Sequence, residues 1–161
     1  GYPHPGFSCV PAPRDLPAPR VEWAARRCTV GDSRPCRCRD APPPGLLAGI
    51  ALFNAGRFYD CHEELEAIWR AEPHPVRALY QGILQIGVAF HHLGRGNWRG
   101  AHNLLTAGIE KVSRFLPTCM GVDTAALVEQ SQRCLDLLCA LGPERAAAFD
   151  WTLVPQVVVR Q

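Results

Sequence analysis

Histidine and glutamate side chains are concentrated in one short segment, from His62 to Glu66. Because His62 and Glu66 are four residues apart, they lie one turn apart on a helix and can contact each other. His62 falls inside an apolar stripe, so its ring nitrogens need hydrogen-bond partners, and Glu66 can accept from one of them. With a further ligand from a facing helix, the pair could bind a divalent metal such as zinc, iron or manganese. Glu63 could then act as the general base that takes a proton from metal-bound water.

Further polar side chains could face this pair from neighbouring helices. Gln81, Gln85 and His92 are spaced by four and seven residues, so they share one face of the long apolar segment that follows. His91 lies on the opposite side of that segment, and His102 lies at the margin of the next apolar stripe. Helix bundles build metal sites from Glu and His on facing helices, so these five residues form a candidate polar cluster.

The number of ligands decides between a metal site and a structural network. A catalytic zinc site typically uses three protein ligands and an open position, whereas His62 and Glu66 supply two. The spacing also lacks the second helical histidine of the HisGluXXHis zinc motif. Hydrogen bonds among histidine, glutamate and glutamine can satisfy the same side chains without a metal. The residues therefore favour a structural polar cluster, with a metal or catalytic site and a non-metal ligand site as alternatives.

The turn from Arg95 to Gly100 is a candidate anion-binding site. It opens a helix, where free backbone N–H groups attract anions, and Arg95 and Arg99 add positive charge. A solvated turn between two helices is the alternative interpretation of this segment.

Four of the eight cysteines precede the expected helices: Cys9, Cys28, Cys36 and Cys38. They do not form the paired CysXXCys knuckles of a zinc site, so unpaired thiols are expected there, with zinc as the alternative. No secretory signal is visible at the start of the sequence, which predicts reduced thiols and a cytoplasmic location. Three cysteines at core or flanking helix positions are expected to act as small hydrophobic residues: Cys61, Cys134 and Cys139.

The elements that must position these residues are helices, bounded by glycine and proline. Gly56, Pro73, Gly94, Pro117 and Gly142 stop successive apolar segments, and Asp123 is a typical N-cap. The expected helices are Leu46–Ala55, Phe58–Ala71, Val76–Leu93, Trp98–Leu116, Thr124–Leu141 and a short Glu144–Phe149. The run 157–159 is β-like but too short to predict a sheet. The pattern predicts an all-α bundle of about five helices in antiparallel hairpins, plus a short C-terminal helix.

Small residues inside the expected helices indicate where helices pack closely. Ala101 and Gly108 are consistent with tight packing of their helix. Gly82 and Gly87 each cost about 1 kcal/mol in a helix interior relative to alanine. Close approach of a neighbouring helix is the expected compensation.

Composition divides the 161 residues into an arm and a body. Residues 1–45 hold ten of the fifteen prolines and an excess of positive charge, so an extended or disordered arm is expected. Residues 46–155 form the expected bundle, and 156–161 a tail. The body has nearly balanced charge, which argues against nucleic-acid binding. Because no apolar run is long enough to span a bilayer, no membrane partner is expected either.

Three sequence blocks resemble the DUF309 family: Leu52–Trp69, Tyr80–His92 and Arg95–Ala101. The resemblance covers about residues 46–155 and leaves the arm outside. It implies a small all-helical protein of uncharacterised function, sometimes labelled a predicted metal-dependent hydrolase. The positions that match the motif behind that label are His62, Glu63 and Glu66.

Two functions from different classes follow. The residues favour a structural or interaction module, an adaptor or a homodimerising bundle, in which His62 and Glu66 hold the helices together. The alternative is a metal-dependent hydrolase with His62 and Glu66 as ligands and Glu63 as general base.

Overall fold

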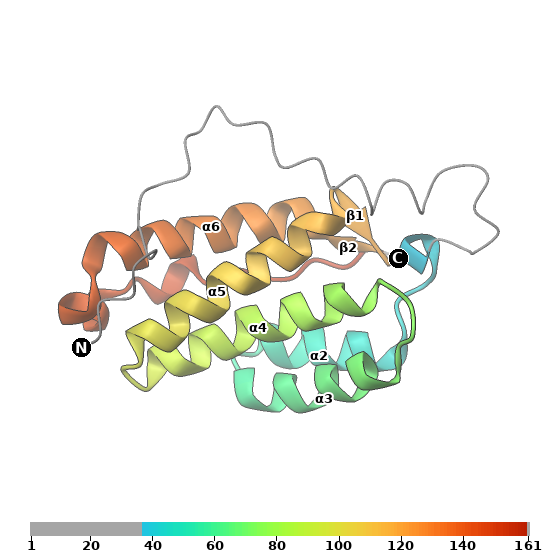
Figure 1. Cartoon of the computed structure of the whole chain (residues 1–161), viewed down its shortest axis with the longest axis horizontal. Coiled ribbons are helices and arrows are strands. Elements are labelled where there is room, and N and C mark those ends of the chain that lie inside the picture. The colour runs from blue at the N-terminus through green and yellow to red at the C-terminus, as the bar shows by residue number, and fades with distance from the viewer. Residues whose placement is uncertain (1–36, 161) are drawn as a thin grey trace.

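The structure, a computed structural model, describes residues 37–160 (Figure 1). Within this range the chain forms five α-helices, which confirms the all-α prediction. They are α2 (Pro44–Asn54), α3 (Phe58–Ala71), α4 (Arg77–Gly94), α5 (Trp98–Val112) and α6 (Thr124–Leu141). Short 3₁₀ helices are η1 (Arg37–Arg39), η2 (Ser113–Phe115), η3 (Pro143–Ala148) and η4 (Trp151–Leu153). No helix of the described residues is long and apolar enough to cross a membrane.

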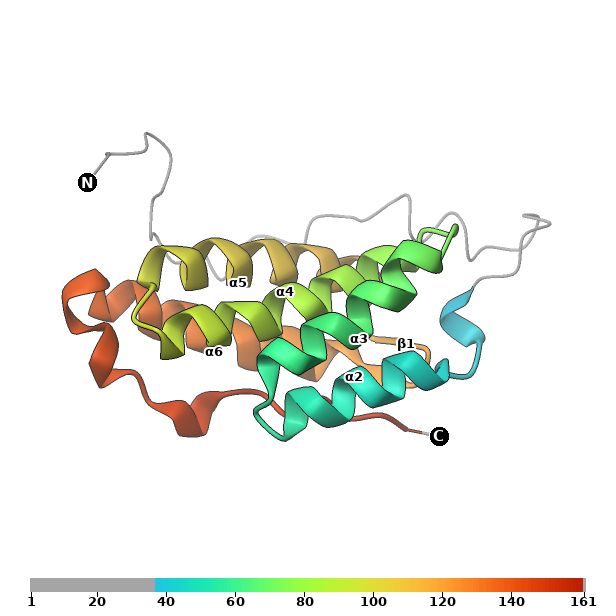
Figure 2. The same cartoon turned by 90° about the horizontal axis from the view of Figure 1, so that it is seen from below.

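Consecutive helices pack against one another, as expected for a series of antiparallel hairpins. Helix α4 lies between α3 and α5, and it packs more extensively on each of them than any other helix pair does (Figure 2). It buries nine residues, among them Leu79, Ile83, Ile86 and Phe90. The sequence of α4, apolar on nearly every side, therefore places it at the centre, where it forms the floor between two flanking helices.

Helix α6 begins at a capping side chain that the sequence predicted. Asp123 Oδ1 accepts a hydrogen bond of 2.9 Å from the backbone N–H of Ala126, one of the donors that the first turn leaves unpaired. The helix then runs over the predicted residues, Thr124–Leu141.

Removing this cap should weaken the bundle by a small, measurable amount. We expect Asp123→Ala to lower the free energy of unfolding by about 1 kcal/mol, because the Ala126 N–H loses its acceptor. Urea denaturation followed by circular dichroism measures the change. Asp123→Asn keeps an acceptor oxygen and should lose less than half as much; equal losses for both variants would contradict the capping role.

Four predicted helices differ from the observed elements. Those expected over Leu46–Ala55 and Val76–Leu93 are shifted by one or two residues, to Pro44–Asn54 and Arg77–Gly94. The helix expected over Trp98–Leu116 is α-helical only to Val112 and continues as η2. Leu116 is extended with ψ of 151°, because the residue before a proline is disfavoured in the helical region. The short helix expected at Glu144–Phe149 is a 3₁₀ helix, η3, with a kink at Arg145.

A small sheet that the sequence did not predict follows η2. Strands β1 (Thr118–Cys119) and β2 (Val122–Asp123) pair antiparallel, and Val159 forms a bridge to Val122. Met120 and Gly121 connect the strands, both with positive φ, as two-residue hairpin turns require. Strands of two residues carry too little alternation to be recognised in a sequence.

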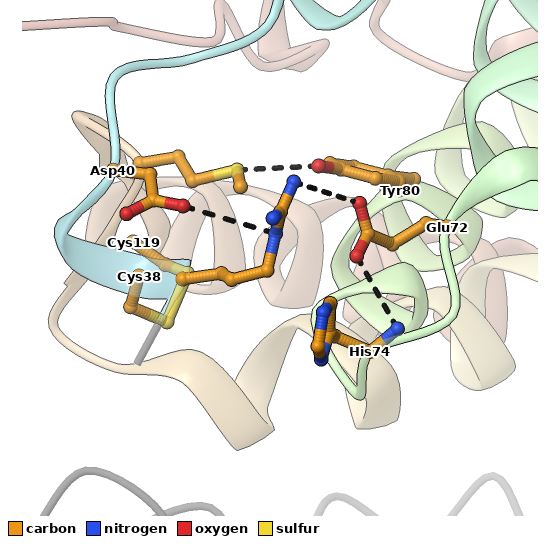
Figure 3. Close-up of polar contacts among 8 residues, drawn as sticks. Cys38, Asp40, Glu72, His74, Tyr80 and Cys119 are labelled. Atoms are coloured by element: carbon orange, nitrogen blue, oxygen red, sulfur yellow. Dashed lines mark hydrogen bonds and ion pairs between the residues drawn. A yellow bond between two sulfur atoms is a disulfide. The ribbon is translucent and has the colours of Figure 1, made fainter. Parts of the chain in front are cut away.

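The segment before α2 also differs from the expected arm. Its last residues, from Arg37, are attached to the bundle, because Cys38 forms a disulfide with Cys119 of β1 (Figure 3). The prediction of reduced thiols is therefore wrong for these two residues. A pairing across 81 residues of sequence follows from the fold and not from any local spacing. Cys38 is thus not a free zinc ligand. Residues 1–36 of the expected arm, which include Cys9, Cys28 and Cys36, lie outside the described residues.

Candidate binding cleft

A cleft of about 240 Å³ lies over α4, between α3 and α5. Helix α4 supplies the floor, α3 one wall, and Leu104 of α5 part of the other. Its lining combines four polar side chains with four that are mainly apolar: His62, Glu66, Gln81, Gln85, Trp69, Leu84, Val88 and Leu104. On α3 the lining residues are 62, 66 and 69, and on α4 they are 81, 84, 85 and 88. Within each helix they are spaced by three or four residues, so they lie on the one face that borders the cleft.

The wall from α3 carries a chain of polar contacts. His62 Nε2 lies 3.3 Å from Glu66 Oε2, and the other carboxylate oxygen of Glu66 pairs with Arg70 at 2.5 Å. The Nδ1 atom of His62 is buried and has no hydrogen-bond partner. A neutral ring with its proton on Nε2 fits this geometry, since it donates to Glu66 and leaves no buried N–H unpaired.

The floor carries two glutamine amides. Gln85 Oε1 accepts a hydrogen bond of 3.0 Å from Lys111 Nζ of α5, and both side chains are only partly buried. Gln81 lies one turn earlier on the same face. Because each amide group combines an acceptor oxygen with two N–H donors, the floor can bind either a donor or an acceptor on a ligand.

The histidines predicted to join this cluster are engaged elsewhere. His91 packs against Tyr59 with ring centroids 5.5 Å apart, and His92 Nδ1 lies 3.2 Å from Asn97 Nδ2. His102 is buried and stacks on Trp98 with a centroid distance of 5.0 Å. The structure thus brings together His62, Glu66, Gln81 and Gln85 of the predicted residues, and separates the other histidines from them.

The remaining predicted site residues lie on the surface. Glu63 is exposed and is not among the residues that line the cleft. Arg95 and Arg99 are exposed around the start of α5, where the Asn97 side chain itself accepts from the Gly100 N–H at 2.9 Å. The helix terminus is therefore partly capped by its own sequence.

Part of the chain, including the residues that line the cleft, is similar in sequence to known proteins. Residues 46–104 match the family described as "Domain of unknown function (DUF309)". Over these residues the chain is similar to the DUF309 family. Over 94 residues it is also 31% identical to the "Uncharacterized protein YpuF" of Bacillus subtilis strain 168. That alignment covers 56% of this chain and 54% of YpuF, so the chain spans about half the length of the curated relative. No solved structure matches the chain.

The DUF309 segment contains the whole lining of the cleft. Its bounds, 46 and 104, enclose α2 from Leu46 onward, all of α3 and α4, and the part of α5 that ends at Leu104. All eight lining residues fall between His62 and Leu104. The cleft is therefore a feature of the family segment, whereas α6 and the β1–β2 hairpin lie beyond the matched residues.

The residues of the DUF309 cleft do not fit a metal centre. No group of three or more His, Cys, Asp or Glu side chains that could hold a metal occurs among residues 37–160. Of the two candidate ligands, Glu66 is paired with Arg70, whose positive charge competes with a cation. The nearest further polar groups lining the cleft are amides, which are poor substitutes for the third histidine, cysteine or carboxylate of a catalytic zinc site.

Cys61 on α3 and Cys134 on α6 are buried and do not line the cleft. Burial raises the pKa of Cys61 to about 12, and burial, helped by Asp150, raises that of Cys134 to about 12. Both thiols therefore stay protonated at neutral pH and fill core space, as predicted for small hydrophobic residues.

Several lining residues were not predicted from the sequence. Trp69, Leu84, Val88 and Leu104 have the spacing of ordinary core positions, and only the packing of three helices leaves them half-buried around an opening. One signal was readable, because Trp69 lies seven residues after His62 and so shares its face. The guanidinium of Arg77 lies 5.2 Å from the Trp69 ring and supports the ring from the α4 side.

Proposed function

We propose that this protein is a helical interaction module whose cleft binds an aromatic side chain of a partner protein. The observation that carries the proposal is the lining, which combines apolar side chains with two amides and a paired His62–Glu66. Aromatic anchors that fill such pockets contribute much of the binding energy of many protein interfaces. A cytoplasmic location belongs to the same proposal.

The size of the cleft supports a single side chain as the occupant. Pockets that enclose whole small-molecule ligands usually measure about 300–1,000 Å³. At about 240 Å³ this cleft is smaller, and it is formed by the surfaces of three helices. One tyrosine or tryptophan side chain suits this space better than a complete cofactor or metabolite.

The chemistry of the lining specifies an aromatic residue with a polar tip. Leu84, Val88 and Leu104 supply apolar contact, and Trp69 supplies an aromatic face on which a second ring can pack. Gln81 and Gln85 supply hydrogen-bonding groups at the floor. A tyrosine hydroxyl or tryptophan N–H needs such a partner when it is buried, whereas phenylalanine does not.

Binding of side-chain fragments tests the proposal. We expect 4-methylphenol to shift the NMR signals of the Gln81 and Gln85 amides saturably, with a dissociation constant on the order of millimolar for so few atoms. In Leu104→Trp the added ring fills the cleft and the shifts should disappear. Gln132→Leu, at a partly exposed position of α6 away from the residues that line the cleft, is the matched control and should bind as the wild type does. Shifts spread over the surface and unchanged in Leu104→Trp would overturn the proposal.

Two further outcomes would assign the cleft differently. Zinc, iron or manganese near one equivalent in the purified protein, lost in His62→Ala, would replace the proposal by the metal-dependent hydrolase. A dimer in analytical ultracentrifugation that both Leu104→Trp and Tyr59→Ala dissociate would identify a second copy as the partner. Tyr59 is the test residue because 58% of it is exposed on α3.

A further inference from the structure

The chain segment from Arg37 to Pro43, here called the strap, crosses one end of the bundle before α2 begins. Its Cys38 is bonded to Cys119 (Figure 3). The Cys38 carbonyl also accepts a hydrogen bond of 2.7 Å from the Met120 N–H. Arg37 Nη2 lies 3.2 Å from Glu72 Oε2, beyond the end of α3. The strap therefore joins the β1–β2 hairpin to the end of α3.

Buried polar groups lie at this end of the bundle. Tyr80 and Met120 are each 1% exposed, and the Tyr80 hydroxyl donates to Met120 Sδ at 3.4 Å. Glu72 is 8% exposed and also accepts from the His74 N–H at 3.2 Å. Burial raises the pKa of Tyr80 to about 12, and the nearby Glu72 adds to the shift. The charged side chains of the strap therefore act on both buried groups. Arg37 pairs with Glu72, and Arg37 and Asp40 both influence the pKa of Tyr80.

The strap itself contributes little to the core. None of the residues of η1 is buried, Arg39 and Asp40 are exposed, and Arg37 keeps about a third of its side-chain surface. The Arg37–Glu72 pair joins a guanidinium that is about a third exposed to a buried carboxylate, and Glu72 also accepts from the His74 N–H. The apolar anchors begin only inside α2, at Leu46. Without the disulfide, few strong contacts would hold Arg37–Pro43 against the hairpin.

We propose that the Cys38–Cys119 disulfide is a reversible redox latch that fastens the strap over the end of α3 and the β1–β2 hairpin. The reductant is a dithiol of the class that cells use to reduce protein disulfides. Disulfides in cytoplasmic proteins are usually transient and redox-sensing, which favours a latch at the proposed location over a permanent staple. This inference rests on the contacts of the strap and on the proposed cytoplasmic location, and it does not depend on what the cleft binds.

The exchange reaction balances without any further reactant. A thiolate of the dithiol attacks Cys38, the more exposed partner, and the Cys119 sulfur leaves and takes up a proton. The second thiol of the dithiol then attacks the mixed disulfide and releases Cys38. Two electrons and two protons pass to the protein, and the dithiol becomes a disulfide.

Hydrogen exchange on the oxidised and reduced full-length chain tests the latch. We expect dithiothreitol to reduce the bond in the folded protein, with the far-ultraviolet circular dichroism unchanged. Thiol trapping and mass spectrometry should then find Cys38 and Cys119 labelled. The Met120 amide should exchange at least about tenfold faster after reduction, whereas the amides of Ile83 and Ile86 in α4 should not change.

Two variants complete the test. Cys119→Ser should show the fast Met120 exchange without reductant, and Cys139→Ser, on α6, should keep the full response to reduction. If Cys119→Ser does not fold, the comparison of oxidised and reduced wild-type protein decides alone. A bond that resists dithiothreitol until the bundle unfolds, or Met120 exchange that reduction leaves unchanged, would overturn the latch.

Discussion

Leu65→Ala is expected to lower the free energy of unfolding by about 2–5 kcal/mol, the range found for leucine truncations in packed cores. Leu65 is fully buried on α3. Its Cδ2 atom lies 2.6 Å from the place where a Cβ on Gly49 would stand, so the side chain fills the space that this glycine leaves on α2. A cavity at this position can close only if two helix backbones move together, which places the expected loss in the upper half of the range.

Chemical denaturation of Leu65→Ala measures this loss directly. Leu153→Ala is the matched control, because Leu153 is 36% exposed on η4 and its truncation leaves no enclosed cavity. It should change the free energy of unfolding by less than about 0.5 kcal/mol. Equal losses for the two variants would mean that α2 and α3 do not pack as the structure places them.

Gly108→Ala is expected to have the second large effect, a loss of folding stability. Helix propensity alone would predict a gain. Alanine is favoured over glycine by about 1 kcal/mol inside a helix. A Cβ at Gly108 would nevertheless lie 2.7 Å from the Gly82 carbonyl oxygen and 3.0 Å from the Ile86 backbone nitrogen. These are backbone atoms of α4, so the clash is relieved only by separating α4 from α5. Such overpacking costs about 1–3 kcal/mol, and we expect a net loss of stability.

The same substitution at the end of α4 provides the control for Gly108. A Cβ at Gly94 would meet Trp151 at 3.7 Å, an ordinary van der Waals contact. Gly94→Ala should therefore leave the midpoint of thermal unfolding nearly unchanged. A Gly108→Ala protein more stable than the wild type would show that the two helices are further apart than described.

Local signals in the sequence predicted most of the fold. Helices α3 and α6 begin and end at the predicted residues, because glycine, proline and the Asp123 cap act on their own neighbours. The close approach expected at Gly82 and Gly108 is confirmed, since a Cβ at either position would lie within about 3 Å of the facing helix. A glycine inside a helix is visible in the sequence itself, so this contact could be predicted.

Contacts between distant residues could not be predicted in this way. The Cys38–Cys119 bond and the β1–β2 hairpin depend on which ends of the bundle meet, and no periodicity encodes that. The cleft was half predictable, since His62 with Glu66 and Gln81 with Gln85 each share a helix face. The hydrogen bond from Lys111 to Gln85 required the position of α5 relative to α4.

The central claim is that the cleft binds an aromatic ring through its polar tip as well as its apolar body. The most direct measurement compares the dissociation constants of 4-methylphenol and toluene by NMR titration of the wild type and of Gln85→Leu. We expect the phenol to bind the wild type about 3- to 10-fold more tightly, the net value of one hydrogen bond. In Gln85→Leu that preference should fall, while the affinity for toluene stays the same or rises. An equal preference in both proteins, or no binding of either ring to the wild type, would contradict the account.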